Sequence, residues 1–368
     1  MTVYIVQVFL IGILGFFMNP NRSELRKRNY LFIVFLVLVI VSGLREYTVG
    51  ADTKNYVAMF NSVNSVGAIS ARIEGGFVYY LKFLRLLSDD PRVLLFASAS
   101  ICVGVACVFI YKLSKAPIMS AELYVLMGGY FTQMNAMRQS IALAITEIAF
   151  LIILLNKDNL LWKKVLSGLF IVLAASFHTV AIIAFIPYAL MLRNNGEDKE
   201  TRLTAGKTLR NSFMAAIVGF VAYSIVMMAA TRILPGYAYY FGNSSWSDAN
   251  YNASLFNSLI AIIFAITGAW AFGRKKLNGV QRFAAIMIGF SIIFYVLSMR
   301  MEIWARVAGM FSAYTYFLWV PEFFSEMRNY HNRAIIKGTI LAFAFAYMIV
   351  VLVFRPEWTQ VVPYLLRQ

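Results

Sequence analysis

The sequence predicts an all-α polytopic membrane protein, and three observations lead to this prediction. Of the 368 residues, 61% are hydrophobic and only 14% are charged, against about a quarter in a typical soluble domain. Apolar runs of about 17 to 20 residues recur along the chain, and each is long enough to cross a bilayer. The basic residues are concentrated in the gaps between these runs.

We expect about twelve transmembrane spans. Their approximate bounds are 2–19, 30–44, 93–111, 119–136, 139–155, 164–178, 180–192, 212–231, 256–273, 280–298, 306–324 and 336–354. Lys and Arg gather in every second gap, at 20–30, 112–119, 156–164, 193–211, 274–282 and 326–337. The positive-inside rule makes these gaps cytoplasmic and places both ends of the chain outside. The net charge of +16 is therefore mainly a topology signal, and no nucleic-acid partner is expected.

We expect a single integral membrane domain over 1–368, with 193–211 as a cytoplasmic loop and 232–255 as an outer loop rich in Tyr, Asn, Ser and Trp. A longer outer segment, 45–92, contains the stretch "FVYYLKFLRLL" (77–87). Its helical spacing puts apolar side chains on one face and charged ones on the other. This pattern predicts a helix that lies in the interface or enters the bilayer part-way. The apolar face comprises Phe77, Tyr80, Leu81, Leu84 and Leu87.

Several charged residues fall at the predicted outer face rather than in the basic loops. They are Arg45, Asp52, Arg138, His178, Arg300, Glu302 and Arg306. Charges at membrane depth are costly and normally line a cavity or a substrate path.

Each of these residues also has a purely structural interpretation. Arg138 could only reach to lipid headgroups, and Glu302 with Arg306 could form a simple helical ion pair. His178 could be a hydrogen-bonded core residue, and Asp52 could only shape a turn. The joint occurrence of charge in separate segments at one face favours a site.

The residue types favour the recognition of phosphate. Arginine presents a fixed fork of donors that matches phosphate oxygens and keeps its charge. Several arginines could neutralise a diphosphate leaving group where other enzymes use a divalent cation. The sequence contains no C-x-x-C, H-E-x-x-H, P-loop or D-x-D metal motif. Tyrosine and tryptophan in the outer loops suit the stacking of sugar rings.

The stretch "GLREYTVGADTKNYVAMF" (43–60) resembles the G-x-R-x-x-x-V-G-x-D-T-x-x-Y pattern of the EpsG family, which are Wzy-like polymerases of bacterial exopolysaccharide and O-antigen. The resemblance continues through "IEGGFVYYL" (73–81), "MNAMRQSIALAI" (134–145), "LAASFHTVAIIAFIPYAL" (173–190) and "RVAGMFSAYTYFLWVP" (306–321). One departure is Gly75, where the family often has proline after the glutamate.

This resemblance implies a GT-C-like or O-antigen-polymerase-like helical bundle with an outer-face cavity. It implies transfer of a growing glycan from its undecaprenyl-diphosphate carrier to a lipid-linked repeat unit, outside the bacterial inner membrane. We expect a metal-independent, inverting displacement without a cofactor. The expected partners are the undecaprenyl-diphosphate-linked oligosaccharide, membrane lipids and a chain-length regulator protein.

The site residues are expected to divide into three groups. Arg45, Arg138, Arg300 and Arg306 are assigned to the diphosphate. His178, Asp52 and Glu302 are candidates for orienting or deprotonating the acceptor hydroxyl, with His178 leading because a neutral imidazole can accept a proton. Glu74, Tyr56, Tyr239 and Trp246 are assigned to the glycan or the acceptor.

Three other functions remain open at this point. A flippase or transporter would favour charges near the midplane and related halves, and apart from Glu147 the sequence has neither. An O-antigen ligase would use similar chemistry with a different acceptor. A membrane acyltransferase would use His178 as its catalytic residue and, with acyl-CoA, would place the site on the cytoplasmic face.

Overall fold

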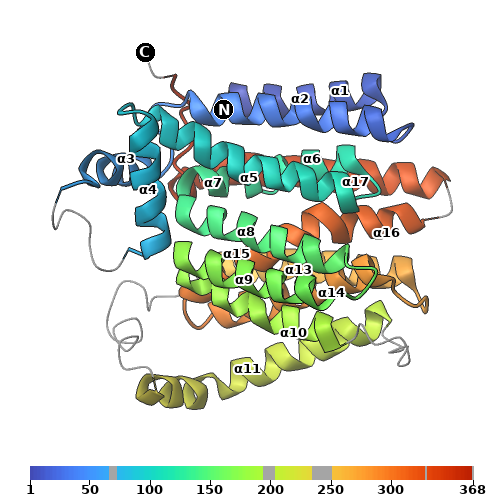
Figure 1. Ribbon diagram of the computed structural model, residues 1–368. Helices are drawn as coiled ribbons and strands as arrows, with labels where there is room; N and C mark the ends of the chain where they lie inside the picture. The colour runs from blue at the N-terminus through green and yellow to red at the C-terminus, as the bar shows by residue number, and fades with distance from the viewer. Residues whose placement is uncertain (66–72, 194–203, 234–250, 328–329, 367–368) are drawn as a thin grey trace. The chain divides into compact units, whose positions relative to one another are not determined.

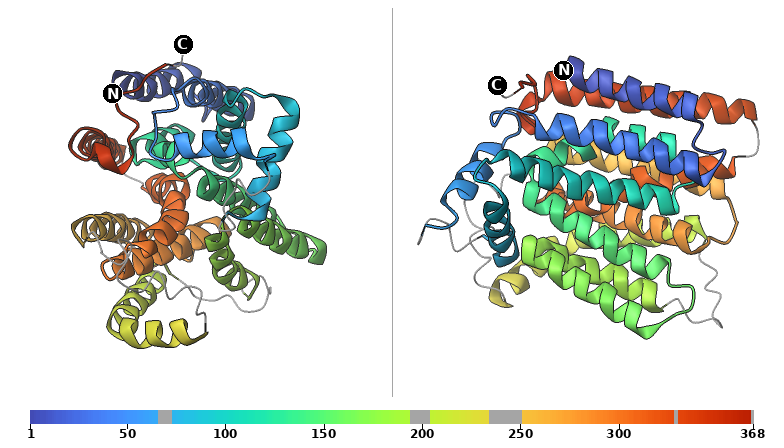
Figure 2. Two further views of the ribbon diagram at one scale, coloured as in Figure 1. Left: turned by 90° about the vertical axis from the view of Figure 1, so that its left-hand side faces the viewer. Right: turned by 45° about the horizontal axis from the view of Figure 1, so that its top comes forward.

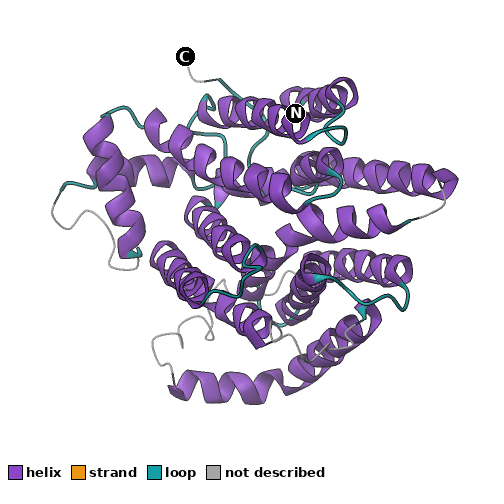
Figure 3. Cartoon of the chain, turned by 45° about the vertical axis from the view of Figure 1, so that its right-hand side comes forward, coloured by secondary structure: helices purple, strands orange, loops and turns teal. Residues whose placement is uncertain are grey.

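The computed structural model confirms the helical prediction. The structure describes residues 1–65, 73–193, 204–233, 251–327 and 330–366, and within these ranges it consists of helices and connections without any β-strand (Figure 3). The chain divides into two compact units. Unit 1 comprises Met1–Asn195 and Asn329–Gln368, and unit 2 comprises Gly196–Arg328. The expectation of one membrane domain over the whole chain stays a prediction.

Unit 1 contains the first and the last helices of the chain. They are α1 (Thr2–Met18), α2 (Glu24–Gly43), α3 (Thr53–Ser62), α4 (Gly75–Leu87), α5 (Arg92–Leu113), α6 (Pro117–Leu126), α7 (Gly129–Asn135), α8 (Met137–Leu154), α9 (Leu161–Phe177), α10 (Phe185–Arg193) and α17 (Tyr330–Ile349). Helix α8 packs against α9 and α5, and α2 packs against α5. Helices α1 and α17 lie side by side, with the rings of Phe9 and Phe345 6.3 Å apart (Figure 2).

The helix ends of unit 1 form two groups (Figure 1). At one end lie the junctions α1–α2, α5–α6 and α8–α9, which contain the basic gaps 20–30, 112–119 and 156–164. At the opposite end α2 and α9 finish, α8 begins, and α3 and α4 lie across the bundle. The basic gaps that alternate along the sequence of unit 1 therefore lie together at one end of its helices. Which side of the membrane each end faces stays a prediction.

Helix α4 covers the stretch 77–87, and its placement in the interface or part-way into the bilayer stays a prediction. Phe77, Leu81 and Leu84 are buried against α3, α5 and α9, as the helical spacing predicts. Leu87, expected on the same face, is 62% exposed because it is the last residue of the helix and follows the packed turns.

The predicted span 119–136 is interrupted. Helix α6 ends before Gly128, whose backbone adopts φ 86°, and α7 starts at the next residue. Glycine has no Cβ, so it adopts this left-handed conformation readily. Hydrophobicity could not reveal this break, since the apolar composition is continuous across it.

Unit 2 is built around α14. Its helices are α11 (Ala205–Ile233), α13 (Tyr251–Phe272), α14 (Gly279–Ser298), α15 (Ile303–Tyr314) and α16 (Val320–Glu326). Helix α14 packs against α11, α13 and α15. The buried side chain of Trp319 follows α15 and donates from Nε1 to the carbonyl oxygen of Phe264 at 2.8 Å.

Five helical segments in the described part of the chain are long and apolar enough to cross a membrane. They are Arg92–Leu113, Met137–Leu154, Asn252–Phe272, Gly279–Ser298 and Arg333–Phe354. Some of the other predicted spans carry basic residues in the first turns, as α2 does with Arg26, Lys27 and Arg28, and some are short like α1 and α6. The protein is thus a multi-pass membrane protein, while twelve spans and a GT-C-like bundle stay predictions.

Candidate functional site

Three segments of unit 1 meet at the carboxylate of Glu74, which directly precedes α4. Arg138, at the start of α8, forms an ion pair with Oε2 of Glu74. Oε1 accepts hydrogen bonds from Thr179, at 3.1 Å from the backbone N–H and 3.3 Å from Oγ1. Nδ1 of His178 lies 3.4 Å from the same Oε1, which is longer than a well-formed hydrogen bond. We call Glu74, Arg138, His178 and Thr179 the Glu74 cluster.

The Glu74 cluster is largely withdrawn from the surface. The side chains of Glu74, His178 and Arg138 are 15%, 16% and 23% exposed. Burial by itself would raise the pKa of Glu74, but the neighbouring His178, hydrogen bonds from Thr179 and the charge of Arg138 outweigh it and lower the pKa to about 2. Glu74 is therefore a permanent anion, and it is saturated by partners within the protein. It was expected to contact the glycan.

A glycine allows this cluster to form. A Cβ at Gly76 would collide with Oγ of Ser176, so only glycine lets the start of α4 approach the end of α9. Helix α9 ends at Phe177, and His178 follows with an extended backbone. The short 3-10 turn Thr179–Ala184 then reverses the chain towards α10. The imidazole is thus held at a helix break facing Glu74.

The second nitrogen of His178 is available for chemistry. Nε2 is buried and has no hydrogen-bond partner among the described residues. Nδ1 faces a carboxylate, which favours the tautomer with the proton on Nδ1 and a lone pair on Nε2. This arrangement suits a general base whose orientation is set by a carboxylate.

Tyr56 adds a neutral group beside Arg138. It lies on α3, its ring packs edge-to-face on Phe77 at 5.6 Å, and its hydroxyl interacts with the Arg138 guanidinium. Burial raises the pKa of Tyr56, and Arg138 opposes only part of this rise. The phenol therefore stays protonated at neutral pH. Nε of Arg138 is buried without a partner among the described residues, so the guanidinium retains donor capacity beyond Glu74.

Arg45, which was expected to contact the diphosphate, is buried and donates its hydrogen bonds within the protein. Its side chain is 1% exposed. Nε donates to the carbonyl oxygen of Val49 at 3.3 Å, Nη1 to Oγ of Ser42 at 2.8 Å, and Nη2 to the carbonyl oxygen of Met134 at 3.5 Å. Burial lowers the pKa of Arg45 to about 10, which leaves it charged at neutral pH. Since its donors are used internally, we assign Arg45 to the scaffold of the site.

The segment 42–53 holds the α7–α8 junction that precedes Arg138. The N–H of Ala51 donates to Oδ1 of Asn135 at 2.7 Å, and Oγ1 of Thr53 lies 3.1 Å from the carbonyl oxygen of Met134. Gly50 has φ 99°, and a Cβ there would lie 2.6 Å from the same carbonyl oxygen. Gly50, Thr53 and Arg45 of the motif at 43–60 therefore each have a local structural role.

The C-terminal strap, residues 355–366, binds this segment from the other side. The N–H of Gly50 donates to the carbonyl oxygen of Gln360, and the N–H of Glu46 to that of Leu365, both at 2.8 Å. The Tyr364 hydroxyl donates to the carbonyl oxygen of Val41 at 2.9 Å. Analysis of the sequence missed this element, because backbone hydrogen bonds leave no trace in residue types.

The other predicted site residues make none of the described contacts with the Glu74 carboxylate. Asp52 precedes α3, is exposed, and its side chain does not cap the helix. Arg300, Glu302 and Arg306 are exposed residues of unit 2. The Arg300 guanidinium stacks on the ring of Phe220, 4.1 Å from its centre. Their convergence with Arg138 stays a prediction. Tyr239 and Trp246 fall outside the described residues.

The comparisons with known proteins agree with the motif. A scan against protein-family models matches the EpsG family over residues 28–366. Searches of curated proteins and of solved structures return no match. The family match covers the segments that form the Glu74 cluster and the strap. The chain therefore belongs to the EpsG family, a family of Wzy-like polysaccharide polymerases.

Proposed function

We propose that this protein transfers a growing glycan from its polyprenyl-diphosphate carrier to a lipid-linked repeat unit. The observation that supports this most directly is the Glu74 cluster, in which an imidazole with a free nitrogen and an arginine with spare donors share one carboxylate. The family supplies the reaction class, and the cluster supplies a base and a cation for it. We place the reaction on the outer face of the bacterial inner membrane, since the cluster lies at the end of unit 1 opposite the basic loops.

The acceptor hydroxyl of the repeat unit attacks the anomeric carbon of the donor sugar. A new glycosidic bond forms on one face as the carbon–oxygen bond to the diphosphate breaks on the other, so the configuration inverts. The hydroxyl proton passes to Nε2 of His178, and the electron pair of the broken bond goes to the diphosphate oxygen. The Glu74 carboxylate stabilises the imidazolium that results.

The negative charge gained by the diphosphate requires cations. Arg138 is assigned to this role by its remaining donors, and Arg300 and Arg306 by their exposure and chemistry. Asp52 and Glu302 remain as alternatives to His178 for the base. Tyr56, Tyr239 and Trp246 are assigned to the sugars, with Tyr56 also steadying Arg138. Independence from a metal and cooperation with a chain-length regulator belong to the same proposal.

The test is purified protein with a defined lipid-linked repeat unit, read as a glycan ladder on a gel. Wild type should form a ladder, also with chelator present. Substituting His178→Ala or Arg138→Lys should lower the initial rate by about 10² or more, as for the loss of a base or a charge-stabilising donor. Arg85→Gln is the matched control, because Arg85 on α4 pairs with the exposed Asp89 that follows the helix, and neither belongs to the Glu74 cluster. Normal ladders from both cluster variants would refute the proposed roles.

The same assay separates the alternatives. A ligase adds glycan once to a different acceptor and forms no ladder from the repeat unit alone. A flippase forms no new glycosidic bond. A ladder that disappears with chelator and returns with a divalent cation would refute the metal-independent mechanism while retaining the polymerase.

A further inference from the structure

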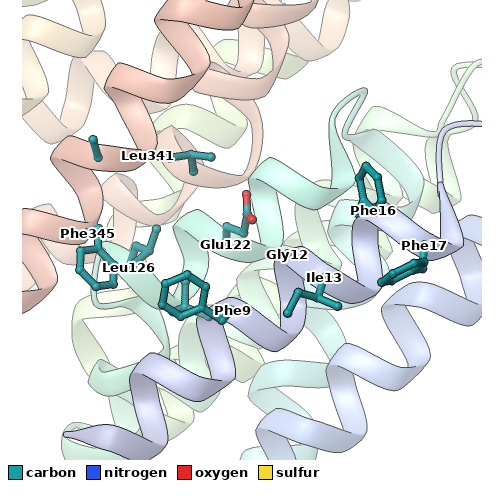
Figure 4. A pocket seen from close by; sticks show the side chains of 11 residues that line it. Phe9, Gly12, Ile13, Phe16, Phe17, Glu122, Leu126, Leu341 and Phe345 are labelled. Carbon is teal, nitrogen blue, oxygen red and sulfur yellow. The ribbon is translucent and has the colours of Figure 1, made fainter.

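Unit 1 contains a second potential site, formed by α1, α6 and α17. These helices enclose a cavity of about 490 Å³ (Figure 4), within the range of about 300–1,000 Å³ that is common for small-ligand sites. Its walls are mainly apolar side chains, among them Phe9, Ile13, Leu126 and Phe345. Glu122 is the one lining side chain that can ionise.

The position of Glu122 depends on a glycine of the facing helix. A Cβ at Gly12 would lie 2.8 Å from Oε1 of Glu122, so the bare backbone of α1 makes room for the carboxyl group. Oε2 is buried and has no hydrogen-bond partner in the described part of the chain. Lys337 on α17 lies close enough for electrostatic attraction. An ionisable group among apolar membrane helices indicates a functional site, and here it presents an acceptor oxygen that lacks a donor.

The cavity opens at an apolar part of the surface of unit 1. Phe9, Phe16 and Phe17 line it and are 59%, 79% and 76% exposed. Helix α1 ends at Met18, about 9 Å beyond Gly12 at 1.5 Å per residue. Exposed basic residues follow directly, among them Arg22 and Arg26. An apolar cleft below a basic rim is complementary to a lipid with an anionic phosphate.

We propose that this cavity binds one phospholipid whose headgroup carries hydrogen-bond donors. An acyl chain fills the space between α1, α6 and α17, and the phosphate meets the basic rim. An ammonium or hydroxyl donor of the headgroup reaches Glu122. The site lies towards the basic end of unit 1, away from the Glu74 cluster, and the inference does not rest on the proposed polymerase activity.

The experiment compares lipids with identical acyl chains bound to delipidated protein in detergent, read by native mass spectrometry. Phosphatidylethanolamine carries ammonium donors, phosphatidylglycerol carries hydroxyl donors, and phosphatidylcholine carries neither. Wild type should bind at least one of the first two about tenfold more tightly than phosphatidylcholine, as expected for one additional hydrogen bond. Which of the two binds more tightly identifies the donor.

Two kinds of variant test the two parts of the site. Glu122→Gln should abolish the preference among headgroups while keeping the cavity. Gly12→Leu and Ala342→Leu should weaken the binding of all three lipids, because each fills the cavity from one of two opposite walls. Ala342 is exposed, so its replacement leaves the core unchanged. Gly338→Leu is the control, because Gly338 lies one turn away on α17, where an added Cβ would meet no atom within 4 Å. Equal binding of all three lipids by wild type, or unchanged binding by Ala342→Leu, would overturn the proposal.

Discussion

Glu74 connects three separate segments of unit 1, and the pH range over which its carboxyl group is ionised determines where this connection stabilises the fold. Its pKa is lowered to about 2 by hydrogen bonds and by Arg138 against the opposing effect of burial. A carboxyl group whose pKa falls on folding stabilises the folded state above its ordinary pKa and loses this effect as the pH falls towards the lowered value. The connection should therefore persist throughout the physiological range.

This argument predicts a specific pH dependence for Glu74→Gln. The difference in melting temperature between wild type and variant should be constant from about pH 6 to pH 8. It should shrink as the pH falls from 4.5 towards 2, the ordinary and lowered pKa values of Glu74. Thermal unfolding in detergent at a series of pH values measures it. A difference that already vanishes at pH 6 would show that Glu74 is not ionised and paired as described.

Gly50 gives a second prediction at the scale of one residue. Gly50→Ala should destabilise the protein by about 1–3 kcal/mol, because alanine is strained at φ 99° and its Cβ would meet the Met134 carbonyl oxygen. Gly75→Ala is the matched control, since a Cβ there meets no atom within 4 Å. It should be neutral or stabilising by up to about 1 kcal/mol. Equal melting temperatures for the two variants would contradict the close approach at Gly50.

At the scale of elements, the strap and the motif segment 42–53 act together on the α7–α8 junction. Gln360 contributes through its backbone, which has φ 49° and accepts from the N–H of Gly50. A β-branched residue pays about 1–2 kcal/mol for this conformation, whereas glycine adopts it without cost. The strap can thus be loosened without touching any side chain of the Glu74 cluster.

We expect Gln360→Val to lower the rate of polymerisation and Gln360→Gly to preserve it. Hydrogen exchange should increase in peptides covering 42–54 and 130–138 in the valine variant, while α5 stays protected. Hydrogen exchange can be measured in a variant whether or not it polymerises glycan. Unchanged exchange in both peptides would show that the strap does not support the junction.

The elements also show which parts of the structure can be predicted from sequence. Amphipathic spacing predicted α4 because Phe77, Leu81 and Leu84 face one side, and composition predicted the long apolar helices. The break at Gly128 and the strap escaped prediction, because a single backbone angle and main-chain hydrogen bonds do not alter hydropathy. Arg45 was assigned to phosphate by its charge, but its environment decides its role, and that environment comes from segments distant in sequence.

At the scale of the whole molecule, the sequence predicts which helix ends share a side of the membrane. In unit 1 the structure places the basic junctions at one end and the Glu74 cluster at the other. Cys102 and Cys107 are buried. We therefore expect them to react little with a maleimide, so that the labelling signal comes from the introduced cysteine. Labelling therefore tests the orientation directly.

We expect Asp52→Cys to react with an impermeant maleimide added outside intact cells. Lys157→Cys, in the α8–α9 junction, should react only after the membrane is opened. Glu302→Cys in unit 2 should behave like Asp52→Cys if the predicted orientation holds there as well. Reaction of Lys157→Cys from outside would reverse the orientation and exclude the proposed location of the reaction.

The strap has a consequence for how the protein is made. Glu46 and Gly50 leave the ribosome well before Leu365 and Gln360, whose backbone carbonyl groups accept their hydrogen bonds. Most helices can be inserted while the nascent chain is still growing, yet the junction beside Arg138 has to wait until the strap has been synthesised. A ribosome that stalls within α17 would therefore leave a membrane-inserted protein whose α7–α8 junction lacks the strap.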